Sequence, residues 1–498
     1  MSTESPPPLS RRVAAGAAWL AGVRMLVRSI GLLSTIILAR LLLPEDFGLV
    51  ALASALMFVL ETLSDLRFEQ AIIAQRDTSN ADFDTAFTLN VLRSVGVALL
   101  IALLAFPYAA LMSDTRLAGL LLVLAVAPLI NGLKNPAFVT YEKSLSFQRE
   151  FVLQLSHKVT TFAVTVSLAL IWRNYWALVA GMLVGSVVRV AGSYLLHPYR
   201  PHLALSAWRR LVGFSGWLMA SNLVAAVLQR MEIFLIGAFL PTPVVGRYHV
   251  GAEIANLASN ELTLPLKRAL LPALSSLDAG SSHQYASFRR AIEVNTAIVL
   301  PVGIGLSLVA EPFVRLVLGD RWLETSAIIT FLAPAAAVRA VAGMCDVLSI
   351  ASGNTRLVFR RELTKAVVAV PLFAVGIWAD GLRGLLYAVA AIAVFVLAIN
   401  LDMVRRQSGR PLLEPLRGAW RSVVACVAMV GALNLLPAVP PHETAMALLF
   451  QALAPQVLTG AAVYAAAHLL LWLSSGRPPG PEQYLLGLLG ERRRPGTQ

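Results

Sequence analysis

The feature that most constrains the fold of this chain is a series of long apolar segments that recurs along its whole length. Each segment is about 18 to 28 residues long, and a helix needs about 20 apolar residues to cross a bilayer. Charged residues make up only 14% of the chain, against about 25% in a typical soluble protein, and the mean hydropathy is +0.71. We therefore expect an all-α polytopic membrane protein.

About fourteen membrane-spanning helices are predicted from these segments. The two cysteines, Cys345 and Cys426, fall inside predicted spans, so they are interpreted as small apolar packing residues and not as a disulfide framework. The expected spans are residues 14–42, 47–66, 85–110, 117–138, 153–172, 175–197, 213–240, 245–270, 288–317, 324–351, 362–379, 383–404, 419–437 and 445–473.

The net charge of +13 is distributed unevenly over this topology. If the N-terminus is cytoplasmic, 26 of the 41 Lys and Arg residues lie in inside segments, 11 lie within or at the ends of helices, and the outer loops hold only four. Such a bias orients membrane proteins, so both termini are predicted to be cytoplasmic. The positive charge is thus a topology signal and not a nucleic-acid-binding surface. The clusters at 405–421 and 492–494 could also contact anionic membrane lipids.

Two landmarks recur at a constant offset of 198 residues: Trp19 matches Trp217, and Gly48 matches Gly246. Both copies start on the same side of the membrane, so the repeat is parallel and predicts two six-helix lobes, a geometry suited to alternating access. The expected divisions are a cytoplasmic tail at 1–12, an N-lobe at 13–198, a C-lobe at 199–404, two further helices at 405–474 and a second tail at 475–498.

Four arginines near the middle of predicted spans are candidates for binding an anionic substrate: Arg24, Arg28, Arg230 and Arg339. Charge inside a membrane is costly and usually faces a cavity. Arg24 and Arg28 share one helical face because they are four residues apart. A guanidinium binds a diphosphate bidentately and keeps its charge. The alternatives are structural: Arg230 could pair with Glu232, and Arg339 could bridge helices.

The predicted span 245–270 carries a polar stripe on one helical face, formed by His249, Glu253, Asn256 and Asn260. Glu61 and Glu232 add carboxylates in two other spans. These groups could carry a proton or a sodium ion through a transport cycle, or they could be fixed counter-ions for the arginines. His249 could also be an interfacial residue. No cofactor, metal site or catalytic residue is predicted, because no metal-ligand cluster, P-loop or nucleophile motif is recognised.

The stretch LLLPEDFGLV at 41–50 contains two adjacent acids, Glu45 and Asp46, between two apolar runs. The charge count puts this turn on the outer side, where both acids are expected to stay hydrated without a catalytic role. Pro44 is expected to end one helix, and Gly48 to permit a tight entry to the next. A role of this first copy in gating the outer mouth is the alternative.

Two local motifs, LLLPEDFGLVALA at 41–53 and YEKSLSFQREF at 141–151, resemble segments of the polysaccharide transporter family, the Wzx-like lipopolysaccharide and exopolysaccharide flippases of the MOP superfamily. The resemblance implies a MOP/MATE-like fold and a flippase in the bacterial inner membrane. Its cargo would be undecaprenyl-pyrophosphate-linked oligosaccharide repeat units, held in a central cationic cavity lined by helices one, two, seven and eight. A polysaccharide polymerase and glycosyltransferases would be partners in the same biosynthesis.

Three other functions compete with this interpretation. A murein precursor flippase would have the same helix count, but we do not find its characteristic motifs. A MATE-type cation-coupled drug exporter usually has twelve helices and favours acidic sites. A polysaccharide polymerase or ligase would need a large outer loop, and the outer loops predicted here are short.

Overall fold

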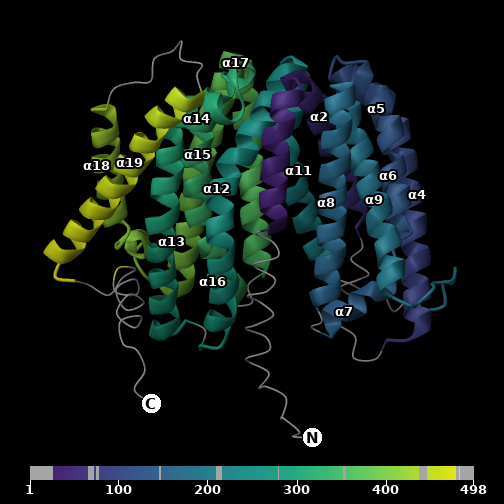
Figure 1. Cartoon of the computed structure of the whole chain (residues 1–498). Coiled ribbons are helices and arrows are strands. Elements are labelled where there is room, and N and C mark those ends of the chain that lie inside the picture. Colours follow the sequence, from purple (N-terminus) through teal and green to yellow (C-terminus); the bar gives the residue numbers. More distant parts are fainter. Residues whose placement is uncertain are drawn as a thin grey trace, which may run out of the picture. The chain divides into compact units, whose positions relative to one another are not determined.

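The computed structural model describes residues 26–65, 72–73, 78–144, 147–208, 216–278, 280–351, 355–436, 446–477 and 482. Within these residues the regular structure is helical throughout (Figure 1). Contacts divide the chain into two compact units, residues 1–246 and 247–498. Each unit is described separately below.

The first unit is a bundle of apolar helices. A helix over 26–41 precedes the others, and within the bundle α2 packs on α11, α4 on α5 and α6, and α8 on α9. The helices that follow in chain order are α2 (Pro44–Ser64), α4 (Asn80–Leu111), α5 (Arg116–Leu124), α6 (Val126–Gly132), η1 (Pro136–Val139), α7 (Thr140–Lys143), α8 (Phe147–Trp172), α9 (Trp176–Leu196), α11 (Gly216–Phe239) and the start of α12 (Thr242–Ser275).

The second unit contains the rest of α12 and a bundle in which α13 packs on α15 and α18, α15 on α17, and α18 on α19. A core of buried apolar side chains, including Phe288 and Met344, joins α12, α13, α15, α16 and α17. The elements are α13 (Ser282–Leu308), α14 (Ala310–Val317), η2 (Asp320–Trp322), α15 (Thr325–Ala342), α16 (Met344–Ala351), α17 (Thr355–Ser408), η3 (Glu414–Leu416), α18 (Trp420–Asn434) and α19 (Met446–Ser474).

The predicted all-α membrane fold is confirmed. Among the described residues eight helices are long and apolar enough to cross a membrane, or nine if the bent segment from Arg116 to Lys143 is one span. The figure of fourteen crossings stays a prediction, although each predicted span coincides with helix in its described part. Spans 362–379 and 383–404 both lie in α17, separated by a kink at Asp380 and Gly381, where the φ of 53° favours glycine.

Three predicted spans are broken helices and not continuous ones. Span 117–138 consists mainly of α5 and α6, span 288–317 of α13 and α14, and span 324–351 of α15 and α16. The α15–α16 break frees a carbonyl at Ala342, which accepts a hydrogen bond from Asn400 Nδ2 at 2.8 Å. A break inside a membrane is tolerated when another side chain satisfies the backbone in this way.

The two turns of the predicted repeat lie against each other in the first unit. A Cβ added at Gly48 would overlap the backbone of Thr242, and one added at Gly246 would overlap the backbone of Pro44. The two glycines therefore permit a backbone contact that no larger residue allows. Gly48 and Gly246, which recur at the 198-residue offset, are thus also neighbours in space. Trp19 lies outside the described residues.

Three expectations for the LLLPEDFGLV turn were wrong. Gly48 lies inside α2, four residues after its start, and does not mark the entry to that helix. Pro44 begins α2 and does not end the preceding helix, because proline fits the first helical turn, where its missing N–H is not needed. Asp46 is buried, 8% exposed, and does not stay hydrated. Its Oδ2 accepts a hydrogen bond from the Leu43 N–H and its Oδ1 accepts one from the Tyr175 N–H, both at 2.9 Å. Glu45 forms an ion pair with Arg116.

Candidate functional site

A cationic pocket of about 370 Å³ lies in the first unit, within the range of small-molecule sites. Three apolar side chains contribute to its wall: Val27, Phe138 and Leu153. The polar lining has three cationic side chains and one acid, so the pocket is electropositive. Its polar residues are Lys134, Glu150, Gln154, His157, Lys158 and Arg189.

Helices α8 and α9 supply most of this polar lining, because they pack closely over much of their length. Two glycines of α9 make this possible: a Cβ at Gly181 would overlap the Thr165 side chain, and one at Gly185 would overlap Thr161. The Nζ atom of Lys158 lies beside Gly31 of the helix over 26–41, 3.4 Å from the position of an added Cβ. The first helix therefore closes one side of the cationic lining.

His157 fixes the orientation of Arg189 at the pocket. Its Nδ1 lies 2.8 Å from the Gly185 carbonyl oxygen, and its Nε2 lies 2.8 Å from Arg189 Nη2. Arginine can only donate, so Nε2 must be the acceptor, and the ring proton on Nδ1 must be donated to the carbonyl. The imidazole in this arrangement is neutral, and the whole cationic charge of the pair remains on Arg189.

Glu61 of α2, a predicted buried carboxylate, lies in a cationic environment in the same unit. Arg93 of α4 and Arg189 of α9 are both close enough to interact electrostatically with it. Arg93 Nη1 also donates to Ser64 Oγ, at 3.4 Å. The surroundings of Glu61 connect it through Arg189 to the cationic pocket. These surroundings suit a carboxylate that acts as a fixed counter-ion. The interpretation of Glu61 as a proton carrier stays a prediction.

Arg230 of α11 lies at an aromatic contact and not at an ion pair. Its guanidinium carbon is 4.5 Å from the centroid of the Phe58 ring, a cation–π distance. Its Nε is buried and has no hydrogen-bond partner among the described residues. Arg28 is exposed on the helix over 26–41, Glu232 of α11 is half-buried, and Arg24 lies outside the described residues.

The predicted polar stripe of α12 contacts Arg339 in the second unit. Asn256 Oδ1 accepts a hydrogen bond from Arg339 Nη2 at 3.0 Å, and Asn256 Nδ2 donates to the Ala252 carbonyl at 2.8 Å. The amide thus bridges α12 and α15. Three further stripe residues are half-buried or exposed: His249, Glu253 and Asn260. The intervening Ile254 and Ala255 are buried.

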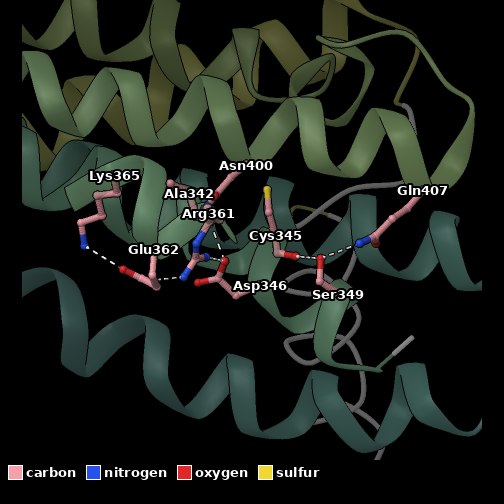
Figure 2. Close-up of polar contacts among 9 residues, drawn as sticks. All are labelled: Ala342, Cys345, Asp346, Ser349, Arg361, Glu362, Lys365, Asn400 and Gln407. Carbon is pink, nitrogen blue, oxygen red and sulfur yellow. Dashed lines mark hydrogen bonds and ion pairs between the residues drawn. The ribbon is translucent and has the colours of Figure 1, made fainter. Parts of the chain in front are cut away.

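A second charged cluster, not predicted from the sequence, joins α16 to α17 (Figure 2). Arg361 pairs with both Asp346 and Glu362, and Lys365 Nζ lies 3.7 Å from Glu362 Oε2. Asn400, only 1% exposed, completes it through its bonds to Ala342 and, at 3.4 Å, to Asp346. One signal was available, since Asp346 is an acid inside a predicted span. Arg361 and Lys365 were instead counted as cytoplasmic charge.

The fold and the cationic pocket together define an all-helical, multi-pass membrane protein with an electropositive pocket inside one helical unit. A family model described as polysaccharide biosynthesis protein matches residues 37–327, and the chain belongs to that family. The lipopolysaccharide biosynthesis protein WzxC of Escherichia coli K12 is 24% identical over 372 residues, which cover 74% of this chain and 76% of WzxC. The succinoglycan biosynthesis transport protein ExoT of Rhizobium meliloti is 24% identical over 300 residues, 60% of each chain.

Solved structures confirm the fold. The lipid II flippase MurJ, in an inward closed conformation, has a TM-score of 0.75 at 12% identity, over 91% of this chain and 99% of MurJ. An inward-facing MATE-family multidrug resistance transporter of the MOP superfamily has a TM-score of 0.57 at 14% identity, over 78% of this chain and 98% of that one. At these identities the likeness establishes the architecture and not the substrate.

Proposed function

We propose that this protein is a flippase that moves undecaprenyl-pyrophosphate-linked oligosaccharide repeat units from the cytoplasmic to the periplasmic leaflet of the bacterial inner membrane. The relatives support a role in polysaccharide transport, since they are described as polysaccharide biosynthesis and transport proteins. The observation that carries the proposal is the cationic pocket between α8, α9 and the first helix.

The pocket suits a diphosphate for an electrostatic reason. A diphosphate that leaves water loses hydration, and this cost is large unless several cations replace the water. Lys158 and Arg189 offer an ammonium and a planar guanidinium on adjacent helices, and the bond to His157 holds the guanidinium in place. Because the Arg189 guanidinium is already held in place, less conformational entropy is lost when the anion binds. The sugar would contact other polar side chains, while the lipid tail stays in the bilayer.

In the proposal, the other charged candidates also take part in transport. Arg24, Arg28 and Arg230 would contribute further positive charge in the first unit, and Arg339, oriented by Asn256, would do so in the second. Glu61, Glu232, His249, Glu253 and Asn260 would contact sugar hydroxyls, balance the arginines or couple transport to a proton or sodium ion. Alternating access between two lobes would carry the bound cargo across, and polymerase and glycosyltransferases would act before and after it.

The test is a complementation experiment in a strain that lacks its own flippase. The double variant Lys158→Gln, Arg189→Gln should reduce surface polysaccharide at least ten-fold and cause lipid-linked repeat units to accumulate, because each lost charge-assisted hydrogen bond costs about 1.5–3 kcal/mol. Arg173→Gln is the control, since Arg173 is exposed and does not line the pocket. Normal surface polysaccharide in the double variant, at wild-type protein level, would refute the proposal. A change in drug sensitivity alone would favour a drug exporter.

A further inference from the structure

A second pocket lies in the other unit, where α13 begins and α17 ends. Its volume is about 80 Å³, several times the ~10–15 Å³ that one water molecule requires. Hydroxyl, amide and guanidinium groups line it, and no acid does. The lining residues used below are Ser281, Ser282, Tyr285, Gln407, Ser408 and Arg410.

The N-terminus of α13 forms one wall of this pocket. Ser281 is the N-cap, and its Oγ accepts a hydrogen bond from the Gln284 N–H at 3.2 Å. The first turn of a helix carries N–H groups without partners in the helix, together with the positive end of its dipole, and both attract anions. This property is common to long helices, so it identifies a ligand only in combination with other groups.

Tyr285 provides an independent indication of a ligand. Its side chain is only 6% exposed, and its hydroxyl has no hydrogen-bond partner among the described residues. A buried hydroxyl without a partner is unfavourable, and nearly all buried polar groups in proteins have a hydrogen-bond partner. An acceptor oxygen in the pocket would satisfy this donor.

Arg410 adds positive charge beside the same tyrosine. Its guanidinium carbon is 4.7 Å from the centroid of the Tyr285 ring. Its Nη1 lies 3.2 Å from Glu414 Oε1, whereas Nε and Nη2 make no hydrogen bond with any described side chain. The pocket therefore offers a helix N-terminus, a phenol hydroxyl and two guanidinium nitrogens to one small anion.

Gln407 supplies the complementary group. Its Nε2 donates to Ser349 Oγ at 2.9 Å, which fixes the amide (Figure 2), and its buried Oε1 has no partner in the described part of the chain. That oxygen needs a donor. A ligand that has phosphate oxygens and also hydroxyl groups would satisfy Tyr285, Arg410 and Gln407 together.

We propose that this pocket binds the phosphate of an anionic phospholipid whose headgroup carries hydroxyls, as in phosphatidylglycerol. The position favours a lipid over a soluble phosphate, because the pocket lies where two long apolar helices end. The exposed Arg405 and Arg406 adjoin it in sequence, and such basic segments attract anionic leaflets. The site would be separate from the transport pocket of the first unit and would bind a resident lipid, not cargo.

The experiment measures binding to the purified full chain in uncharged detergent micelles. The probes are dioctanoyl phosphatidylglycerol, dioctanoyl phosphatidylcholine and inorganic phosphate, and the readout is the apparent Kd from thermophoresis. We expect saturable binding of phosphatidylglycerol that phosphatidylcholine does not reproduce. Tyr285→Phe keeps the ring but removes the hydroxyl, and should weaken binding about five-fold, while Arg410→Gln should weaken it at least ten-fold.

Two matched variants separate the pocket from general surface charge. Arg406→Gln removes the same charge at a 69% exposed side chain paired with Asp402, and should leave the Kd within two-fold of wild type. Glu414→Gln removes the carboxylate that pairs with Arg410 and should tighten the binding of phosphatidylglycerol. If the Arg410–Glu414 ion pair had only a structural role, Glu414→Gln would weaken binding as much as Arg410→Gln does. Equal losses in the 406 and 410 variants, or no effect of Tyr285→Phe, would overturn the proposal. Equal binding of inorganic phosphate, lost in both pocket variants, would overturn the lipid as its source.

Discussion

At the scale of the residue, Gly185 determines whether His157 can orient Arg189. A Cβ at this position would lie 2.8 Å from His157 Cε1 and would overlap Thr161 Oγ1. We expect Gly185→Ala to displace the imidazole, to destabilise the protein by about 1–3 kcal/mol as an overpacked contact, and to lower transport more than stability alone explains. Thermal unfolding and surface polysaccharide measure the two effects.

Gly96→Ala is the control for this prediction. Gly96 lies in α4, and an added Cβ meets nothing within 4 Å. Alanine is favoured over glycine in a helix interior by up to about 1 kcal/mol, so this variant should be neutral or slightly stabilising. A Gly185→Ala protein that matches Gly96→Ala in both measurements would show that the site accepts the added Cβ without displacing His157, and would refute this prediction.

Asp114 leads to a prediction on pH at the same scale. Burial raises the pKa of its carboxyl, but hydrogen bonds from the Arg116 side chain, at 2.8 and 3.0 Å, and from Thr242 Oγ1, at 2.9 Å, outweigh it and leave the pKa below its ordinary value. A carboxyl with a lowered pKa stabilises the fold above the pKa of the unfolded chain, and this stability is lost as pH falls through the folded value.

Asp114→Asn should therefore lower the melting temperature at pH 7, and the difference from wild type should shrink as the pH is lowered through and below the ordinary range of an aspartate. The wild-type and variant proteins are compared in the same detergent over this range. A deficit of constant size at every pH would mean that the carboxylate charge does not contribute.

At the scale of the element, the two turns of the repeat should be sensitive to added volume. The atom nearest to an added Cβ is a backbone carbonyl oxygen at both Gly48 and Gly246, so this obstacle cannot move without shifting α2 or α12. We expect Gly246→Ala to destabilise the protein by about 1–3 kcal/mol or more. Gly119→Ala in α5, where a Cβ has open space, is the matched control. Equal melting temperatures for the two variants would exclude the tight contact.

The sequence predicted the positions of the helices better than their breaks. Span positions follow from apolar runs, which are local, and the kink of α17 coincides with a glycine between two such runs. The α5–α6 break at Ala125 lies three residues before Pro128, which cannot donate a hydrogen bond to the Leu124 carbonyl at the end of α5. The α15–α16 break is satisfied by Asn400, 58 residues away from Ala342. Partners so distant in sequence cannot be inferred from periodicity.

The candidate site shows the same limit. Lys134, Lys158 and Arg189 were among the 11 cations within or at the ends of predicted helices, but depth in the membrane selected Arg24, Arg28, Arg230 and Arg339 instead. The pocket arises because small residues on α9 let α8 approach closely. That packing brings together charges from two helices and a loop. Among the described residues, the Arg339–Asn256 hydrogen bond joins two of the predicted polar groups directly.

At the scale of the whole molecule, each unit has its own charged cluster, so the two can be tested independently. The first unit holds the cationic pocket, and the second holds the Arg361 cluster and the proposed lipid pocket. Variants of Lys158 and Arg189 should therefore alter transport without changing phosphatidylglycerol affinity. Variants of Tyr285 should weaken the binding of phosphatidylglycerol and leave transport unchanged when the lipid is saturating. These separate outcomes distinguish failure of one proposal from failure of the other.

The orientation of the chain is a further prediction at this scale. The last turn of α17 and the segment that follows it carry Arg405, Arg406, Arg410 and Arg417, whereas the kink within α17 adjoins only Arg383. Since basic loops stay in the cytoplasm, alkaline phosphatase inserted after Asp380 should be active in the periplasm, and the same insertion after Gly409 should be at least ten-fold less active. Green fluorescent protein fused after Gln498 should fluoresce. Reversed activities at 380 and 409 would mean that the topology is inverted. The end of the cationic pocket at Lys134 and Glu150 would then face the periplasm, whereas the cargo is proposed to enter from the cytoplasm.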